Sequence, residues 1–169
     1  TDAGVDVLCA AEDTETVAAA LRAAGAEPID EERAEVLRVE RGRPRYGVDL
    51  DDSVIPQEAG LTDRAVSFTK GCYVGQETVA RLFWKGKPNR HLRGLRLEGP
   101  ASVGEPLTLA GKEVGRIGSY ADSPRLGPIG LALLRREAEP GAQLELAGSG
   151  GRATVVELPF ERPVGDAAS

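Results

Sequence analysis

The sequence predicts an α+β protein in which a mixed, largely helical first half is followed by a small antiparallel β-barrel. Residues 91–158 contain six short apolar-rich segments separated by Gly, Pro or Ser, a spacing typical of small closed barrels. Residues 1–82 instead mix segments of helical and strand-like periodicity. The two patterns meet at Lys85-Gly86-Lys87-Pro88, where Gly and Pro break the preceding helix.

We therefore predict a domain boundary at this linker. A chain of 169 residues accommodates one domain or two small ones. The predicted division is a partial α+β domain at residues 1–87, a six-stranded barrel at residues 88–162 and a tail at residues 163–169.

The first predicted elements are a strand and a helix. Residues 4–10 alternate apolar and polar side chains, which favours a short strand and would bury Cys9 within it. Asp13 and Thr14 are N-cap candidates for the helix that follows. Gly25 is expected to end that helix, because glycine readily adopts the left-handed conformation found at helix C-termini.

A second helix, another strand and a third helix are expected before the linker. The second helix begins near Asp30 and stops by Gly42, since the proline two residues later cannot continue it. Residues 65–69 resemble a short strand, residues 71–75 a turn, and residues 76–83 a helix.

The barrel strands are predicted from period-two alternation bounded by turn residues. They cover residues 91–97, 106–109, 113–120, 129–135, 143–146 and 153–158.

Composition limits the function classes. The net charge of −6 argues against a general polyanion binder or a membrane-surface protein. No apolar run approaches the ~18–20 residues of a membrane span. Two cysteines and one histidine cannot complete a Cys/His metal site, so no metal is expected. The first residues show neither a signal-peptide pattern nor an initiator Met, so we expect an internal start and a cytoplasmic location.

Residues 78–97 form a basic segment without a single acid, interleaved with Phe83 and Trp84. Such a segment suits an anionic tail, for example a polyglutamate, or a nucleic-acid backbone. A solvated linker followed by a strand with outward charges explains it equally simply, and we favour this explanation. Nucleic acid is therefore not an expected partner.

The candidate functional thiol is Cys72, in Lys70-Gly71-Cys72-Tyr73-Val74-Gly75-Gln76-Glu77. A nearby ammonium and a helix N-terminus both stabilise a thiolate, and Lys70 and the predicted helix start supply them. The alternative is a small buried apolar thiol, the usual state of a free cysteine. The flanking glycines favour an exposed turn instead.

The candidate ligand-binding carboxylate is Glu40, which breaks two local rules. It lies on the apolar face of its predicted helix and in the last turn, where the helix dipole disfavours an anion. By this argument, neutralising Glu40 stabilises the helix. Such violations are enriched at functional sites, and a carboxylate facing a cavity suits the N–H donors of a pterin. The alternative is an ion pair with Arg38, Arg41 or Arg43, and the pattern leaves both open.

Three segments together resemble a known family. Residues 70–77 are similar to the KGCYxGQE signature of the YgfZ group, which belongs to the glycine-cleavage aminomethyltransferase (T-protein) superfamily. Residues 38–49 resemble its R-x-E-x-G segment, and residues 56–61 resemble its P-x-E-A-x-L segment. The resemblance extends through the predicted barrel. Family members run to about twice this length, so the N-terminal part would be missing.

The resemblance implies a tetrahydrofolate pocket, with Glu40 anchoring the pterin and Lys70 and Tyr46 close to the folate. It also implies that Cys72 is a thiol used in assembly or repair of iron–sulfur clusters, with iron–sulfur client or assembly proteins as partners. One alternative is a tetrahydrofolate-dependent aminomethyltransferase. Another is a redox or cluster-contacting thiol protein whose folate pocket is vestigial.

Overall fold

The computed structural model describes residues 5–160 and divides the chain into two compact units, one up to Ala34 and one from Glu35. The first unit contains the short 3-10 helix η1 (Ala11–Asp13) and α1 (Thr14–Ala23). The strand predicted at residues 4–10 is wrong for the part described, since residues 5–10 belong to no regular element. An isolated strand has no partner for its backbone hydrogen bonds, and no other strand is described before residue 90.

The end of α1 follows the local prediction. Gly25 adopts φ +92°, and the N–H groups of Gly25 and Ala26 donate to Arg22 O and Leu21 O, both at 3.0 Å. This pattern satisfies carbonyls that the helix would otherwise leave unpaired. At the other end Asp13 occupies the N-cap position but makes no side-chain capping hydrogen bond.

The second helix, α2 (Glu31–Glu40), spans the boundary between the two units. The helix begins next to Asp30, as the sequence predicts, and the Asp30 side chain caps it, because its Oδ1 accepts the Arg33 N–H at 2.7 Å. The helix ends at Glu40, and Gly42, two residues later, adopts a φ of +64°. A Cβ on Gly42 would lie 2.8 Å from the Cβ of Leu158, so the glycine also permits a close approach of the chain after the last strand.

The segment before the barrel holds two further helices, α3 (Thr62–Ala65) and α4 (Gln76–Lys85). The strand predicted at residues 65–69 is wrong. Ala65 belongs to helix α3, and residues 66–69 form no strand. Every described strand belongs to the barrel, so residues 66–69 have no edge on which to pair. Helix α4 runs two residues beyond its predicted end, and Gly75 at its N-cap has φ +88°.

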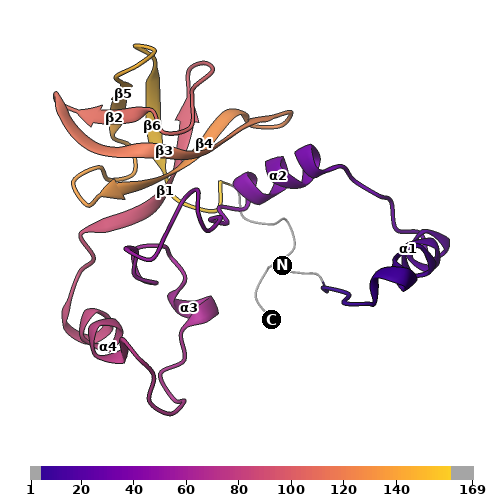
Figure 1. The fold of residues 1–169 in the computed structure, drawn as a ribbon. Coiled ribbons are helices and arrows are strands. Elements are labelled where there is room, and N and C mark those ends of the chain that lie inside the picture. Colours follow the sequence, from indigo (N-terminus) through magenta and orange to yellow (C-terminus); the bar gives the residue numbers. More distant parts are fainter. Residues whose placement is uncertain (1–4, 161–169) are drawn as a thin grey trace, which may run out of the picture. The chain divides into compact units, whose positions relative to one another are not determined.

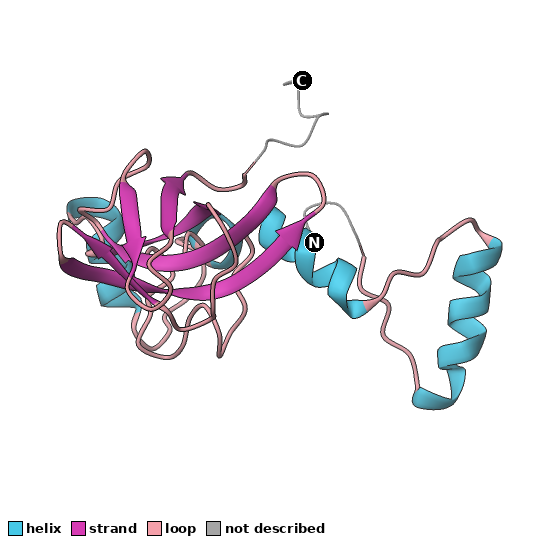
Figure 2. Cartoon of the chain, turned by 90° about the horizontal axis from the view of Figure 1, so that it is seen from above, coloured by secondary structure: helices cyan, strands magenta, loops and turns pink. Residues whose placement is uncertain are grey.

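The predicted six-stranded antiparallel barrel is confirmed (Figure 1). Its strands pair in the order β1-β4-β3-β2-β5-β6 and close on one another. Figure 2 shows the long strands curving around the barrel. The strands are β1 (Arg90–Leu97), β2 (Pro106–Leu109), β3 (Lys112–Ser123), β4 (Gly127–Arg135), β5 (Gln143–Leu146) and β6 (Arg152–Val156).

Two apolar clusters stabilise the second unit. The larger fills the barrel and includes Leu95, Leu107 and Leu134, none of which is exposed. The smaller joins the fully buried Val39 of α2 to barrel residues that include Ile129. Burying one such side chain is worth ~1.5–3 kcal/mol. The second cluster therefore holds the C-terminal end of α2, with Glu40, against the β3–β4 hairpin.

No helix within residues 5–160 is both long enough and apolar enough to cross a lipid bilayer. The tail predicted at residues 163–169 lies outside the described residues.

Candidate functional site

Glu40 is buried at the end of α2, with 9% of its side chain exposed. Its Oε1 accepts a hydrogen bond from Ser123 Oγ at 2.5 Å, and its Oε2 lies 3.0 Å from Arg125 Nη2. Ser123 Oγ also accepts the backbone N–H groups of Arg125 and Leu126, at 3.1 and 2.9 Å, and so organises the β3–β4 turn. The ion-pair alternative named Arg38, Arg41 or Arg43, whereas the cation that pairs with Glu40 is Arg125.

The surroundings of Glu40 keep its carboxylate ionised. Burial alone would raise its pKa, but the hydrogen bonds from Ser123 and Arg125 and the charges of Arg125 and Arg41 outweigh burial, so the pKa is lowered. Ser123 and Arg125 lie more than 80 residues away in sequence. Sequence reasoning missed both, because no local pattern links them to α2.

Arg38, two residues before the end of α2, lies at the centre of a polar cluster. Its Nη2 donates to Glu35 Oε1 at 2.6 Å and to Ser119 Oγ at 2.5 Å, and its Nη1 donates to Asp49 Oδ2 at 3.1 Å. The Asp49 side chain is fully buried, and its Oδ2 also accepts from the Arg45 N–H and from Ser119 Oγ, both at 2.8 Å. Through Asp49 and Ser119, these hydrogen bonds connect the loop of residues 45–49 to β3.

Tyr46 lies on the loop of residues 45–49 but is largely exposed to solvent, with 65% of the residue accessible. Its hydroxyl donates to Asp52 Oδ1 at 2.6 Å, and this hydrogen bond, more than burial, raises the pKa of Tyr46. Glu40, Tyr46 and Lys70 thus have different partners, and among the described residues no contact joins the three side chains.

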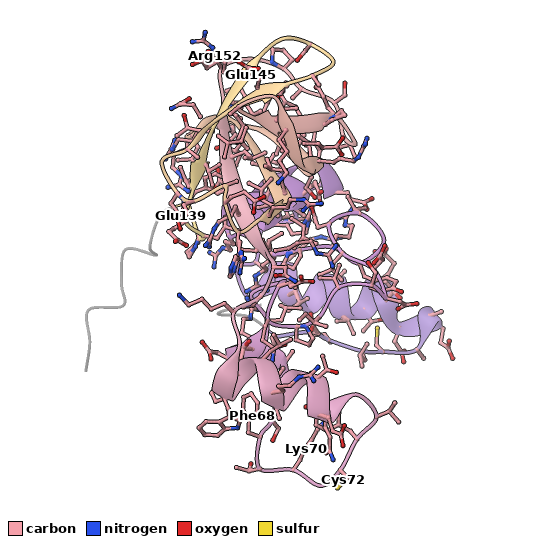
Figure 3. The ribbon with its side chains drawn as sticks, turned by 90° about the vertical axis from the view of Figure 1, so that its left-hand side faces the viewer. Phe68, Lys70, Cys72, Glu139, Glu145 and Arg152 are labelled. Atoms are coloured by element: carbon pink, nitrogen blue, oxygen red, sulfur yellow. The ribbon has the colours of Figure 1, made fainter. Side chains whose placement is uncertain are left out.

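Lys70 and Cys72 project from the exposed loop that leads into α4 (Figure 3). The Lys70 Nζ lies 4.7 Å from the centre of the Tyr73 ring, a cation–π contact. The Tyr73 N–H donates to Gln76 Oε1 at 3.2 Å, while the Gln76 N–H donates to Tyr73 O at 3.3 Å. These reciprocal bonds fix the turn before the helix and leave the Cys72 thiol exposed and unpaired with another cysteine.

Cys9 is exposed as well. The expectation that Cys9 is protected is therefore wrong, and the reason is the missing strand: residues 5–10 are extended chain with no sheet to enclose them. Between residues 5 and 160, no three His, Cys, Asp or Glu side chains gather in a way that could hold a metal ion.

Aromatic side chains cluster on the same segment as the thiol. The Phe68 and Phe83 rings lie 4.1 Å apart, and Trp84 packs edge-on against Phe83 at 5.1 Å. Helix α4 is tied to the preceding loop by Gln57 Nε2, which donates to Val79 O at 2.7 Å. The exposed thiol thus neighbours an exposed apolar surface in sequence.

Three kinds of similarity agree with this architecture. Residues 90–161 match the glycine cleavage T-protein C-terminal barrel domain. The chain is 38% identical over 149 residues to an aminomethyltransferase of Streptomyces avermitilis, a match that covers 82% of this chain and 40% of that protein. It is 34% identical over 169 residues to the aminomethyltransferase of Geobacillus kaustophilus, covering 94% and 46%.

Among solved structures, the glycine cleavage system aminomethyltransferase T of Bartonella henselae superposes with a TM-score of 0.73. The match has 24% identity and covers 88% of this chain and 43% of that one, a likeness that shows the fold. The chain spans less than half the length of the curated relatives it matches. Residues 90–161 are thus similar to the glycine cleavage T-protein C-terminal barrel domain, and the chain is similar in sequence to part of several aminomethyltransferases.

Proposed function

We propose that this chain binds tetrahydrofolate through Glu40 and uses the Cys72 thiol in the assembly or repair of iron–sulfur proteins. The observation that carries the folate part is the buried, ionised Glu40 carboxylate. A carboxylate offers about four acceptor sites, and Ser123 and Arg125 account for two of them. The remaining lone pairs suit the adjacent N–H donors of a pterin ring.

The thiol part rests on the exposure of Cys72 and on the sequence around it. A thiol used on other proteins must be accessible, and Cys72 is free and exposed in a turn fixed by Gln76. Residues 70–77 resemble the YgfZ signature, which supports the accessory role. Lys70 and Tyr46 are proposed to lie beside the folate, on the same resemblance.

A second candidate function is tetrahydrofolate-dependent aminomethyl transfer. The names of the relatives favour it, since several are aminomethyltransferases. This function requires no thiol, so Cys72→Ser would leave it intact. Glycine-cleavage activity with the partner proteins of that system would establish it over the accessory role.

Calorimetric titration with tetrahydrofolate tests the folate site, on this chain and on a version extended to the length of its relatives. Glu40→Gln is expected to weaken binding by ~1.5–3 kcal/mol, the effect of losing a charge-assisted hydrogen bond. Glu32→Gln, in the exposed first turn of the same helix, serves as the matched control and should bind like wild type. Equal affinities for the Glu40 and Glu32 variants would remove Glu40 from the folate site.

Recovery of an oxidatively inactivated iron–sulfur enzyme tests the thiol. Wild type and Cys9→Ser are expected to support recovery, and Cys72→Ser is not. Since Cys9 is exposed too, it controls for non-specific thiol chemistry. Recovery with Cys72→Ser would refute the role of the thiol, whereas recovery without any folate binding would favour the vestigial-pocket alternative.

A further inference from the structure

A groove of about 480 Å³ is lined by residues of the barrel and of two loops, and neither Glu40 nor Cys72 is among its lining residues. Its walls are the loop carrying Val48 and Asp49, residues 103–104, the first half of β3 and the end of β4. A smaller hollow of about 160 Å³ shares Val48, Asp49, Arg90 and Leu133 with it. The groove has the size of a small-molecule site, which typically measures ~300–1,000 Å³.

Two glycines of β3 allow neighbouring segments to pack closely against the strand at the groove. A Cβ on Gly115 would lie 2.6 Å from Leu133 O, and one on Gly118 would lie 2.4 Å from Asp49 Oδ1. The pairing register of β3 shifts on both sides, between Leu107 and Thr108 of β2 and between Ile117 and Ser119 of β3 itself. Such bulges are enriched beside binding sites, where they redirect side chains.

Exposed apolar side chains line the groove. Val48 and Val103 are 44% and 62% exposed, on two different loops, and the half-buried Leu133 of β4 lines the groove with them. They offer a surface for the apolar body of a ligand.

Of the three arginines that line the groove, two form salt bridges with nearby carboxylates. Arg90 lies 2.8 Å from Glu58, and Arg116 lies 3.0 Å from Glu113. The carboxylate of Asp49 is bound by Arg38. Among the cations described in the lining, only the Arg135 side chain makes neither a hydrogen bond nor a salt bridge, although it interacts electrostatically with Glu137.

We propose that this groove binds a small organic carboxylate with an apolar body, whose carboxylate is received by Arg135. The planar guanidinium matches a carboxylate in a two-point hydrogen-bonded geometry. Asp49 also lines the groove, but its Oδ1 is buried and the Asp49 carboxylate is already bound by Arg38, so Arg135 is the polar group that the groove offers to a ligand. The carboxylate can come from two sources, the benzoylglutamyl end of a folate or a free carboxylic acid, and the site does not depend on the function proposed for Glu40.

Titration of the ¹⁵N-labelled chain, followed by amide NMR shifts, tests the site with three probes: p-aminobenzoylglutamate, 4-methylpentanoate and the neutral 4-methylpentanamide. We expect saturable shifts at Val48, Val103, Gly115 and Leu133 with one or both carboxylates, at a Kd of about 1 mM or tighter for probes of this size. The amide should cause none. Tighter binding of p-aminobenzoylglutamate identifies the folate source, and equal binding identifies free carboxylates.

Arg135→Ala is expected to weaken carboxylate binding about tenfold, and the matched control Arg136→Ala, an exposed neighbour outside the groove lining, to leave it unchanged. Val103→Glu places a negative charge on the exposed rim and should also weaken carboxylate binding. This variant tests the site if the Arg135 variant fails to fold. Absence of groove shifts at ~10 mM carboxylate, equal binding of the amide, or equal effects of the two arginine variants would each overturn the proposal.

Discussion

The barrel and the thiol-bearing segment before it, residues 66–89, are stabilised in different ways. The barrel closes its hydrogen-bond ladder, so it has no free edge, and its central leucines are fully buried. In the thiol-bearing segment only Val79 is buried among the described side chains of α4, while Phe83 and Trp84 are 46% and 72% exposed. The stability of the second unit therefore resides in the barrel, and the exposed Cys72 thiol and aromatic side chains lie where few side chains are buried.

This contrast predicts that substitutions in the two regions have different effects. Substitutions in the barrel interior should lower the free energy of unfolding strongly. Substitutions in the thiol-bearing segment should change it little and act mainly on the proposed thiol chemistry and partner binding. The residues that join α2 to the barrel, Val39 and Glu40, lie between these two cases because they contribute to both.

The largest expected effect comes from removing everything before the barrel. A fragment of residues 88–160 should fold, with a sheet-type circular dichroism spectrum and dispersed amide shifts, but with about 3–4 kcal/mol less stability than the whole chain. It loses the packing of Val39, worth ~1.5–3 kcal/mol, and the hydrogen bonds that Arg38 and Glu40 make to β3. The control fragment, residues 30–160, keeps all of α2 with its Asp30 cap and should retain nearly all of the stability.

An unfolded 88–160 fragment would place the domain boundary before residue 88. Equal stability of the two fragments would instead mean that α2 contributes nothing to the barrel.

Within the barrel, Leu95→Ala should lower the free energy of unfolding by about 2–5 kcal/mol, because it leaves a cavity in a fully buried position. Phe83→Ala, in the thiol-bearing segment, removes a larger side chain that is already half exposed. It should lower stability by less than about 1 kcal/mol. Urea unfolding of both variants measures the contrast, and similar losses would show that the segment is as tightly packed as the barrel.

Glu40→Gln should lower stability by about 1–2 kcal/mol at pH 7, since it weakens charge-assisted bonds to Ser123 and Arg125. This reverses the sign expected from the helix dipole alone. The pKa of Glu40 is lowered in the folded state, so its contribution is fully present above the unfolded value of ~4.3 and is lost as the pH falls through the folded value.

Unfolding curves between pH 7 and pH 3 should therefore converge for wild type and Glu40→Gln. A difference that stays constant over this range would show that the carboxylate is not the titrating group.

The smallest effect is expected at the thiol. Cys72→Ser should change stability by no more than ~0.5 kcal/mol, because the side chain is exposed and bonded to nothing. A thiol reagent should label both Cys72 and Cys9 in the folded protein, and mass mapping of the peptides would measure each. Protection of either cysteine until unfolding would contradict the exposed loop or the exposed N-terminal segment.

The sequence by itself determined the elements whose stability is local. The alternation of residues 91–158 predicts all six strands, and Gly25, Asp30 and Gly42 predict helix ends, because backbone conformation at a glycine or a cap depends on a few neighbouring residues. It also predicted the exposed turn around Cys72 from Gly71 and Gly75.

Only the tertiary structure decided which strand-like segments are strands and which groups pair. Residues 5–10 and 65–69 have the alternation of strands but no neighbour to complete their hydrogen bonds, so they remain outside any sheet. The partners of Glu40 follow it by 83 and 85 residues, and the groove that contains Arg135 is formed by five separate segments of the chain. Such arrangements depend on how distant segments pack, and a pattern within a short window carries no information about them.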